Sequence, residues 1–248
     1  MTDERRTTAD RGAPEAGARA PDGRTFAEWN EAMVERYDIE RYYERSHAVV
    51  RWVEERRLRA LVELAGAGAG ARVLEVGCGA GHVLERFGGA RLVGVDLSPM
   101  MLARTRRRLD GQVELIQASA DRLPFEDAEF DVVLCTEVLE HVLDPAAVVA
   151  ELMRVATPDG RVIVSIPNEA NIDRAKRLLR RLLPARTVLR TLASEGNEWH
   201  LHRFDLTSLR RMLRGLATID RMRAVPGRWM PLRYVASLRA SPAPSPAD

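Results

Sequence analysis

The sequence predicts an α/β fold in which a seven-stranded, mostly parallel sheet carries helices on both faces. Short apolar segments alternate with helical ones between residues 72 and 166. A glycine-rich turn follows the first of these apolar segments. Strands that alternate with helices form a parallel sheet that is buried on both faces. The length of 248 residues suits one such domain with a sizeable core.

The N-terminal part of the chain divides into a tail and a helical region. Residues 1–22 hold Arg, Ala, Gly, Pro and acidic residues without an apolar period, so we expect them to be disordered. From Phe26 to about Leu64 apolar residues recur at spacings of three and four, which predicts helix. Glycines and alanines at 66–71 end this region. The folded domain is expected to cover residues 23–239.

Five strands and the helices between them are predicted in the central part. The strands are expected at residues 72–76, 91–95, 113–117, 130–135 and 161–166. The helices are expected at residues 82–87, 100–109 and 145–156, with one more that carries Glu137, Glu140 and His141. Ser98 followed by Pro99 is the pattern of a helix cap with proline in the first turn.

The alternation lapses after Pro167. Residues 170–193 form a strongly basic helical stretch, which we assign to a helical lid insert at about 168–200. A strand pattern returns near Ile219 and at 232–238, and we expect these strands to form a hairpin at one edge of the sheet. Residues 240–248 are a second disordered tail, rich in Pro, Ser and Ala.

Composition argues against several classes of protein. The 38 basic and 36 acidic residues leave a net charge of +2, so a nucleic-acid partner has no support. Two cysteines are too few for a disulfide framework, and the N-terminus has no apolar signal region. Apolar runs fall short of the ~18 residues that a membrane span needs. We therefore expect a soluble, cytoplasmic protein.

The turn after the first predicted strand has the features of a nucleoside site. In Glu75-Val-Gly-Cys-Gly-Ala-Gly81 the glycines allow a tight turn and a close approach of the backbone to a ligand. Asp96 ends the next strand, at the spacing of a carboxylate that binds ribose hydroxyls. The glycines run G-x-G-x-G, unlike the dinucleotide pattern, and Glu75 suits a cationic group such as the ammonium of S-adenosylmethionine. A simple βα turn and a helix-capping aspartate are the alternative.

Four successive segments resemble the motifs of class I S-adenosylmethionine-dependent methyltransferases. They are VLEVGCGAGHVL, VGVDLSP, ADRLPFEDAEFDVVLCTEVLEHV and LMRVATPDGRVIVSIPN. The resemblance runs from about residue 72 to residue 168 and implies a Rossmann-like fold with S-adenosylmethionine as cofactor. It further implies that Gly77 and Gly79 line the methionine part of the cofactor and that Asp96 binds the ribose. By the same resemblance, Ser119 and Ala120 lie against the adenine and Thr136 contacts the sulfonium region. Many relatives carry Asp or Asn where this chain has Ser119.

Within this superfamily the ubiquinone-pathway O-methyltransferases look most similar. The similarity lies in CTEVLEHVLDP, the ATPDG turn, the basic insert and the histidine-containing segment before Phe204. In that comparison Arg57 matches an arginine that contacts the cofactor. Small-RNA 3′-end 2′-O-methyltransferases also carry Glu-x-x-Glu-His and a later His, and in them these side chains hold a divalent metal.

Acidic residues and histidines mark the expected acceptor site. Glu137, Glu140 and His141 would share one face of a helix after the fourth strand. Either His141 is a general base, with His202 as a second catalytic candidate, or the three residues bind Mg²⁺ or Zn²⁺. In the second case His200 or His202 would complete the metal site. A third alternative is that Glu137 only touches the cofactor while Glu140 and His141 are scaffold.

We predict transfer of a methyl group to a small-molecule acceptor, on an oxygen of a phenol or catechol-like ring. One alternative is a methyltransferase that acts on nitrogen, carbon or RNA hydroxyls. Two others are a nicotinamide-dependent dehydrogenase and a non-catalytic subunit that binds the cofactor. The basic helix at 172–192 carries a leucine stripe among arginines. It is interpreted as a lid over the acceptor or as a peripheral membrane contact, with phosphate or RNA contact as the third alternative. The sequence does not indicate an oligomeric state.

Overall fold

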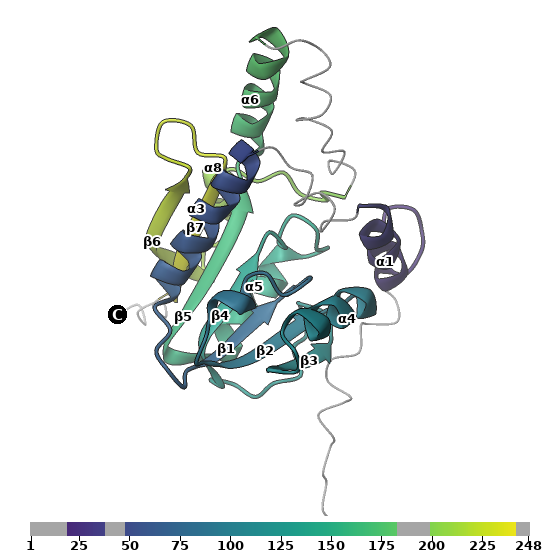
Figure 1. Ribbon diagram of the computed structural model, residues 1–248, viewed down its shortest axis with the longest axis vertical. Helices are drawn as coiled ribbons and strands as arrows, with labels where there is room; N and C mark the ends of the chain where they lie inside the picture. Colours follow the sequence, from purple (N-terminus) through teal and green to yellow (C-terminus); the bar gives the residue numbers. More distant parts are fainter. Residues whose placement is uncertain (1–18, 38–47, 183–198, 242–248) are drawn as a thin grey trace, which may run out of the picture.

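The computed structural model describes residues 19–37, 48–182 and 199–241. Its seven strands form one sheet in the order β3-β2-β1-β4-β5-β7-β6 (Figure 1). The strands are β1 (Arg72–Val76), β2 (Arg91–Asp96), β3 (Val113–Gln117), β4 (Phe130–Thr136), β5 (Ala156–Pro167), β6 (Ala217–Val225) and β7 (Arg233–Ala240). Neighbouring strands in the series β3-β2-β1-β4-β5 are parallel, and β7 is antiparallel to both of its neighbours, β5 and β6. The predicted seven-stranded, mostly parallel sheet with a C-terminal hairpin at its edge is confirmed.

Six α-helices and one 3₁₀ turn are described around the sheet. They are α1 (Phe26–Arg36), α3 (Ala48–Ala65), η2 (Leu84–Arg86), α4 (Pro99–Arg108), α5 (Pro145–Val155), α6 (Glu169–Leu182) and α8 (Leu206–Met212). The predicted cap of α4 is present, because the Ser98 hydroxyl accepts from the Met101 amide at 3.1 Å and Pro99 begins the helix. A capping box of Thr25 and Glu28 begins α1.

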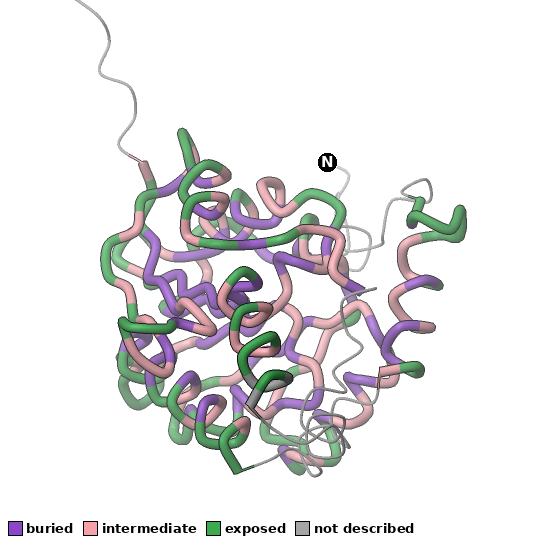
Figure 2. The backbone as a smooth tube through the Cα atoms, turned by 90° about the horizontal axis from the view of Figure 1, so that it is seen from above, coloured by how far each residue is buried: buried purple, intermediate pink, exposed green. Residues whose placement is uncertain are grey.

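Helices cover both faces of the sheet. Side chains alternate along each inner strand, so that on β5 Ile163 packs with α3 while Val162 and Val164 pack with α5 on the other face. Leu61 and Leu64 of α3 are fully buried. Each fully buried leucine stabilises the fold by about 1.5–3 kcal/mol relative to exposure. Figure 2 shows the buried residues gathered in the interior, with exposed residues on the outer turns. Burial on both faces explains the nearly continuous apolar strands.

Two predicted helices are wrong. The segment predicted as a helix at 82–87 forms only the 3₁₀ turn η2. The segment that carries Glu137, Glu140 and His141 consists of turns and bends, because Glu137 has a left-handed φ of 54°. A helix resumes only at Pro145, where the Asp144 side chain accepts from two backbone amides. The three residues therefore do not share a helical face.

The predicted boundaries change at the N-terminus. Arg19 pairs with Thr25 in an isolated bridge and Ala20 is buried, so residues 19–22 are not part of a disordered tail. The described residues do not include the rest of both predicted tails. They also do not include residues 38–47 of the predicted N-terminal helix or residues 183–198 of the predicted lid. In the described chain no helix is long and apolar enough to cross a membrane.

Candidate active site

A cavity of about 730 Å³ lies at the carboxyl ends of four parallel strands. It is lined by Val76 and Asp96, which end β1 and β2, and by Ser119 and Val138, which follow β3 and β4. In open α/β sheets ligands bind in this crevice. Helix α1 supplies the opposite wall, through a set of residues that the sequence analysis did not assign to a site. They are Thr25, Phe26, Ala27, Asn30 and Val34.

The glycine turn forms the floor of the cavity at β1. Gly77 and Gly79 both line the cavity and have left-handed φ values of 73° and 53°. The amides of Gly77 and Cys78 donate to the Val95 carbonyl at 2.7 and 2.9 Å, which closes the turn against β2. A Cβ atom on Gly77 would lie 2.3 Å from Cγ2 of Val138. This position therefore needs glycine for both its backbone angle and its surroundings.

Asp96 presents its carboxylate at the end of β2. Its Oδ2 accepts from the Gly79 amide at 2.8 Å and its Oδ1 accepts from the Ser98 amide at 2.9 Å. Burial raises the pKa of Asp96 to about 6, although these backbone hydrogen bonds act in the opposite direction. Each carboxylate oxygen keeps further acceptor capacity, so Asp96 can accept hydrogen bonds from two ligand hydroxyls.

Ser119 and Ala120 line the cavity next to β3, as expected for an adenine site. The Ser119 hydroxyl donates to Asp121 Oδ1 at 2.5 Å, so its oxygen is left to accept from a ligand amino group. Asp121 also lines the cavity. Both predicted residues thus lie in the cavity wall, and Asp121 is a further lining residue that the sequence analysis did not assign.

Three residues predicted to bind the cofactor are buried beside the cavity rather than in its wall. Arg57 forms an ion pair with Glu54 at 2.8 Å and donates to Ser165 Oγ at 3.4 Å. Thr136 donates to Glu75 Oε1 at 3.4 Å, and Glu75 Oε2 has no partner among the described residues. Burial raises the pKa of Glu75 to about 8, while the charge of Arg57 acts in the opposite direction. None of these three residues lines the cavity.

Glu137 lies in the cavity wall but is held by neighbouring side chains. Its Oε1 accepts from Ser165 Oγ at 2.9 Å, and its Oε2 forms an ion pair with Arg233 at 2.6 Å. Arg233 begins β7, whose neighbour in the sheet is β5 with Ser165. The C-terminal hairpin therefore fixes the orientation of Glu137.

Glu140, His141 and His200 form a cluster that excludes Glu137. Each of the three offers a ligand atom, and these atoms lie within 4.8 Å of one another. Glu140 is 1% exposed and its Oε2 has no partner among the described residues. Burial, with the negative charge of Glu137 second, raises the pKa of Glu140 well above its usual range. His200 supplies the later histidine that the sequence left open between His200 and His202.

Both histidines of this cluster have one ring nitrogen fixed. Nδ1 of His141 lies 3.2 Å from the Trp199 carbonyl oxygen, and Nδ1 of His200 lies 2.7 Å from Glu169 Oε1. Because a carbonyl or a carboxylate accepts, both Nδ1 atoms donate and carry a proton, which leaves Nε2 of a neutral ring such as that of His141 as its basic nitrogen. Burial, with His200 second, lowers the pKa of His141 to about 3, so this ring is neutral.

His202, predicted as catalytic, has a different position. Its Nε2 lies 2.9 Å from the Val142 carbonyl oxygen and donates to it. The backbone amides of Leu201 and His202 donate to the Glu140 carbonyl at 2.7 and 3.1 Å. These bonds attach residues 199–204 to the turn after β4. His202 thus positions the cluster, whereas His141 lines the cavity.

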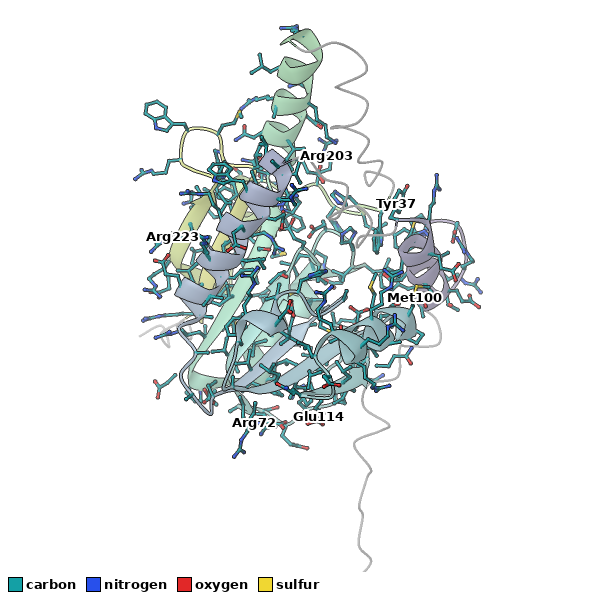
Figure 3. All side chains as sticks on the ribbon, viewed as in Figure 1. Tyr37, Arg72, Met100, Glu114, Arg203 and Arg223 are labelled. Atoms are coloured by element: carbon teal, nitrogen blue, oxygen red, sulfur yellow. The ribbon has the colours of Figure 1, made fainter. Side chains whose placement is uncertain are left out.

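Helix α1 closes the site from outside the sheet. Trp29 and Met33 of α1 pack with Met101 of α4 and with Trp199 in one apolar cluster. Figure 3 shows Tyr37 and Met100, which border this cluster, beside α1. The capping box at Thr25 is the sequence signal that could have located the start of α1, but no local signal indicates that the helix faces the cavity.

The fold is a Rossmann-like α/β arrangement with a cavity at its strand ends, lined by the glycine turn and Asp96. Residues 74–164 match the family model described as "Methyltransferase domain". This segment of the chain is therefore similar to methyltransferase domains.

Curated relatives share this part of the sequence. "Ubiquinone biosynthesis O-methyltransferase" of Acinetobacter baumannii (strain ACICU) is 34% identical over 151 residues, which are 58% of this chain and 62% of the relative. The protein of the same name from Hahella chejuensis is 38% identical over 136 residues, which are 52% of this chain and 56% of the relative. The chain thus spans less than two thirds of the length of these relatives.

Solved structures share the fold. The PH0226 protein of Pyrococcus horikoshii superposes with a TM-score of 0.61 at 21% identity, over 84% of this chain and 99% of that chain. A SAM-dependent methyltransferase from Aquifex aeolicus gives a TM-score of 0.53 at 16% identity, over 73% of this chain and 88% of that chain. At this level of identity the likeness establishes the fold.

Proposed function

We propose that the protein transfers a methyl group from S-adenosylmethionine to a hydroxyl of a small molecule with a phenol or catechol-like ring. One observation carries this proposal. A single cavity joins the glycine turn and Asp96, which suit a nucleoside with a polar tail, to His141 and the cluster around it. The names of the curated relatives, which are O-methyltransferases, support the same acceptor atom.

The residues in the cavity wall fit the cofactor. Gly77 and Gly79 leave room for a close approach at the methionine end, Asp96 accepts from the ribose hydroxyls, and Ser119 with Ala120 lies against the adenine. When bound, S-adenosylmethionine supplies an electrophilic methyl group on a sulfonium. The chain has to orient the acceptor oxygen toward that methyl and remove the hydroxyl proton, and positioning alone supplies about 7–11 kcal/mol.

A divalent metal at Glu140, His141 and His200 is the arrangement that we favour for activating the acceptor. A phenol has a pKa of about 10, so a base or a metal must assist its ionisation. A bound cation would explain the buried, unpartnered Oε2 of Glu140. His200 donates to Glu169, which is the outer-shell arrangement of metal-bound histidines. Two imidazoles and one carboxylate suit Zn²⁺ better than Mg²⁺. Without a metal, Nε2 of His141 is the base.

The test is release of S-adenosylhomocysteine with 4-methylcatechol, 4-methylphenol and aniline as acceptors, each with and without EDTA. We expect turnover of the catechol, loss of turnover in EDTA, and recovery with added Zn²⁺ or Mg²⁺. Glu140→Gln should lower turnover at least about tenfold, because an amide is a poor metal ligand. Glu63→Gln changes a carboxylate that pairs with Arg223 away from the cavity, and it should leave turnover unchanged.

The other outcomes separate the alternatives. Turnover that EDTA does not affect would remove the metal and leave His141 as base. Turnover of aniline alone would make the protein an N-methyltransferase. Tight binding of S-adenosylhomocysteine without any turnover would favour a non-catalytic subunit or an RNA acceptor. Binding of NAD without binding of S-adenosylhomocysteine would contradict the proposal.

We also propose a peripheral membrane contact at α6 and the loop between β6 and β7. Helix α6 projects away from the sheet (Figure 1) and carries exposed Leu178 among basic residues. Asn171 Nδ2 in its first turn donates to the Pro231 carbonyl at 3.0 Å. This bond joins the helix to the loop that bears the exposed side chains of Trp229 and Met230. Aromatic and apolar groups beside arginines suit an anionic lipid surface.

We expect the protein to cosediment with phosphatidylglycerol vesicles, and we expect added salt to weaken this binding. The double substitution Leu178→Ser and Trp229→Ser should reduce the bound fraction several-fold, because it removes apolar side chains that enter the lipid interface. Val62→Ser, which removes a partly exposed side chain of α3, is the matched control. Wild-type protein that stays in the supernatant would contradict this proposal without affecting the methyltransferase one.

A further inference from the structure

Trp199 occupies a central place at the acceptor end of the cavity. It lines the cavity and is only 8% exposed. Its ring lies 4.6 Å from the ring of His141 and stacks on Tyr37 at 6.1 Å, measured between centroids. Its backbone carbonyl also fixes Nδ1 of His141 at 3.2 Å. The indole is thus held from two sides and has a defined orientation.

The indole N–H of Trp199 is buried and has no hydrogen-bond partner among the described residues. A buried tryptophan N–H usually finds a partner, because leaving it unpaired is unfavourable. The indole nitrogen can only donate, so its partner must be a hydrogen-bond acceptor. Because Trp199 forms part of the cavity wall, a bound molecule can supply that acceptor.

The position of Trp199 identifies which molecule this is. The residues assigned to the cofactor stand at the ends of β1, β2 and β3, whereas Trp199 touches His141 in the turn after β4. The side chain of His141 lines the same cavity, as do those of Val142 and Leu143. An acceptor that reaches the His141 cluster with one oxygen therefore brings a neighbouring oxygen toward the Trp199 ring.

We infer that Trp199 is a specificity-determining residue that donates a hydrogen bond to the oxygen adjacent to the methylated one. The inference rests on the proposed function and deepens it, because it assigns a residue to the choice between vicinal dihydroxybenzenes and monophenols. The dihydroxybenzene satisfies the indole N–H, whereas the monophenol leaves it unpaired. A site with an unpaired buried donor discriminates against the analogue that lacks the acceptor.

The first test compares kcat/KM for 4-methylcatechol and 4-methylphenol in the wild type and in Trp199→Phe. The wild type should prefer the catechol, and Trp199→Phe should reduce that preference about tenfold, because phenylalanine keeps the ring and loses the donor. Binding of S-adenosylhomocysteine should not change. Tyr37→Phe keeps both the stacking ring and the donor, so its preference should match the wild type. An equal loss on both acceptors in Trp199→Phe would make Trp199 merely structural and overturn the inference.

A second test does not depend on turnover. In protein labelled with [¹⁵N]tryptophan, the indole resonance that Trp199→Phe removes is assigned to Trp199. With S-adenosylhomocysteine present, 4-methylcatechol should move this resonance downfield and 4-methylphenol should not. No movement with the catechol, or the same movement with S-adenosylhomocysteine alone, would overturn the inference. Turnover of another acceptor without this movement would leave the methyltransferase proposal standing and remove only the role of Trp199.

Discussion

Gly77→Ala is expected to abolish measurable binding of S-adenosylhomocysteine and to destabilise the fold. The φ of 73° at Gly77 is a conformation that costs a residue with a Cβ about 1–3 kcal/mol. The added Cβ would also lie 2.3 Å from Cγ2 of Val138, and overpacking of this kind adds about 1–3 kcal/mol. Relief of this contact moves Val138 or the turn itself, and both line the cavity.

Calorimetric titration and thermal unfolding measure the two consequences, and a second substitution separates their causes. In Val138→Ala the nearest side-chain atom of residue 138 is its Cβ, which lies 3.4 Å from the Cβ added at Gly77. In the double variant we therefore expect part of the lost stability and affinity to return, with the backbone strain remaining. Gly88→Ala is the matched control, because no atom lies within 4 Å of its added Cβ and its φ is not left-handed. Wild-type affinity in Gly77→Ala would remove the turn from the binding site.

Asp96→Ala is expected to weaken S-adenosylhomocysteine binding by roughly 10- to 100-fold. The reason is that a hydrogen bond to a charged group contributes about 1.5–3 kcal/mol and the carboxylate is proposed to accept from the ribose. The same carboxylate predicts a pH dependence. Burial raises the pKa of Asp96 to about 6, and the negative charge of Glu31 on α1 acts in the same direction. Below that pH the group is protonated and loses acceptor capacity, so affinity should fall as the pH is lowered through about 6.

Titration calorimetry at about pH 7.5 and about pH 5 measures this effect, with an expected loss of up to about tenfold at the lower pH. Glu75 has a pKa raised to about 8, so its titration lies mostly above this window. Asp96→Asn should bind more weakly and show a flat profile over the same range. Asp220→Asn on β6 is the control and should keep the wild-type profile. A wild-type affinity that does not change between the two pH values would exclude Asp96 as the ribose ligand.

The sheet and part of the predicted cofactor site followed from local features of the sequence, although Arg57, Glu75 and Thr136 do not line the cavity. The alternation of strands and helices, the glycine turn after β1 and Asp96 after β2 are all local features. A βα turn brings its own residues to the end of its strand whatever the rest of the chain does. In a parallel sheet the ends of neighbouring strands then meet at one edge. Gly77, Gly79, Asp96, Ser119 and Ala120 were therefore located in the cavity wall without knowledge of the tertiary structure.

The arrangement of the predicted acceptor residues depends on contacts between distant parts of the chain. The i, i+3, i+4 spacing suggested a helical face, but Glu137 has a left-handed backbone and pairs with Arg233, outside the cluster of Glu140, His141 and His200. The choice of His200 over His202 follows from bonds between residues far apart in the sequence. His200 is oriented by Glu169, and His202 donates to the Val142 carbonyl. No local propensity encodes such contacts, because each depends on how α6, β7 and the turn after β4 pack together.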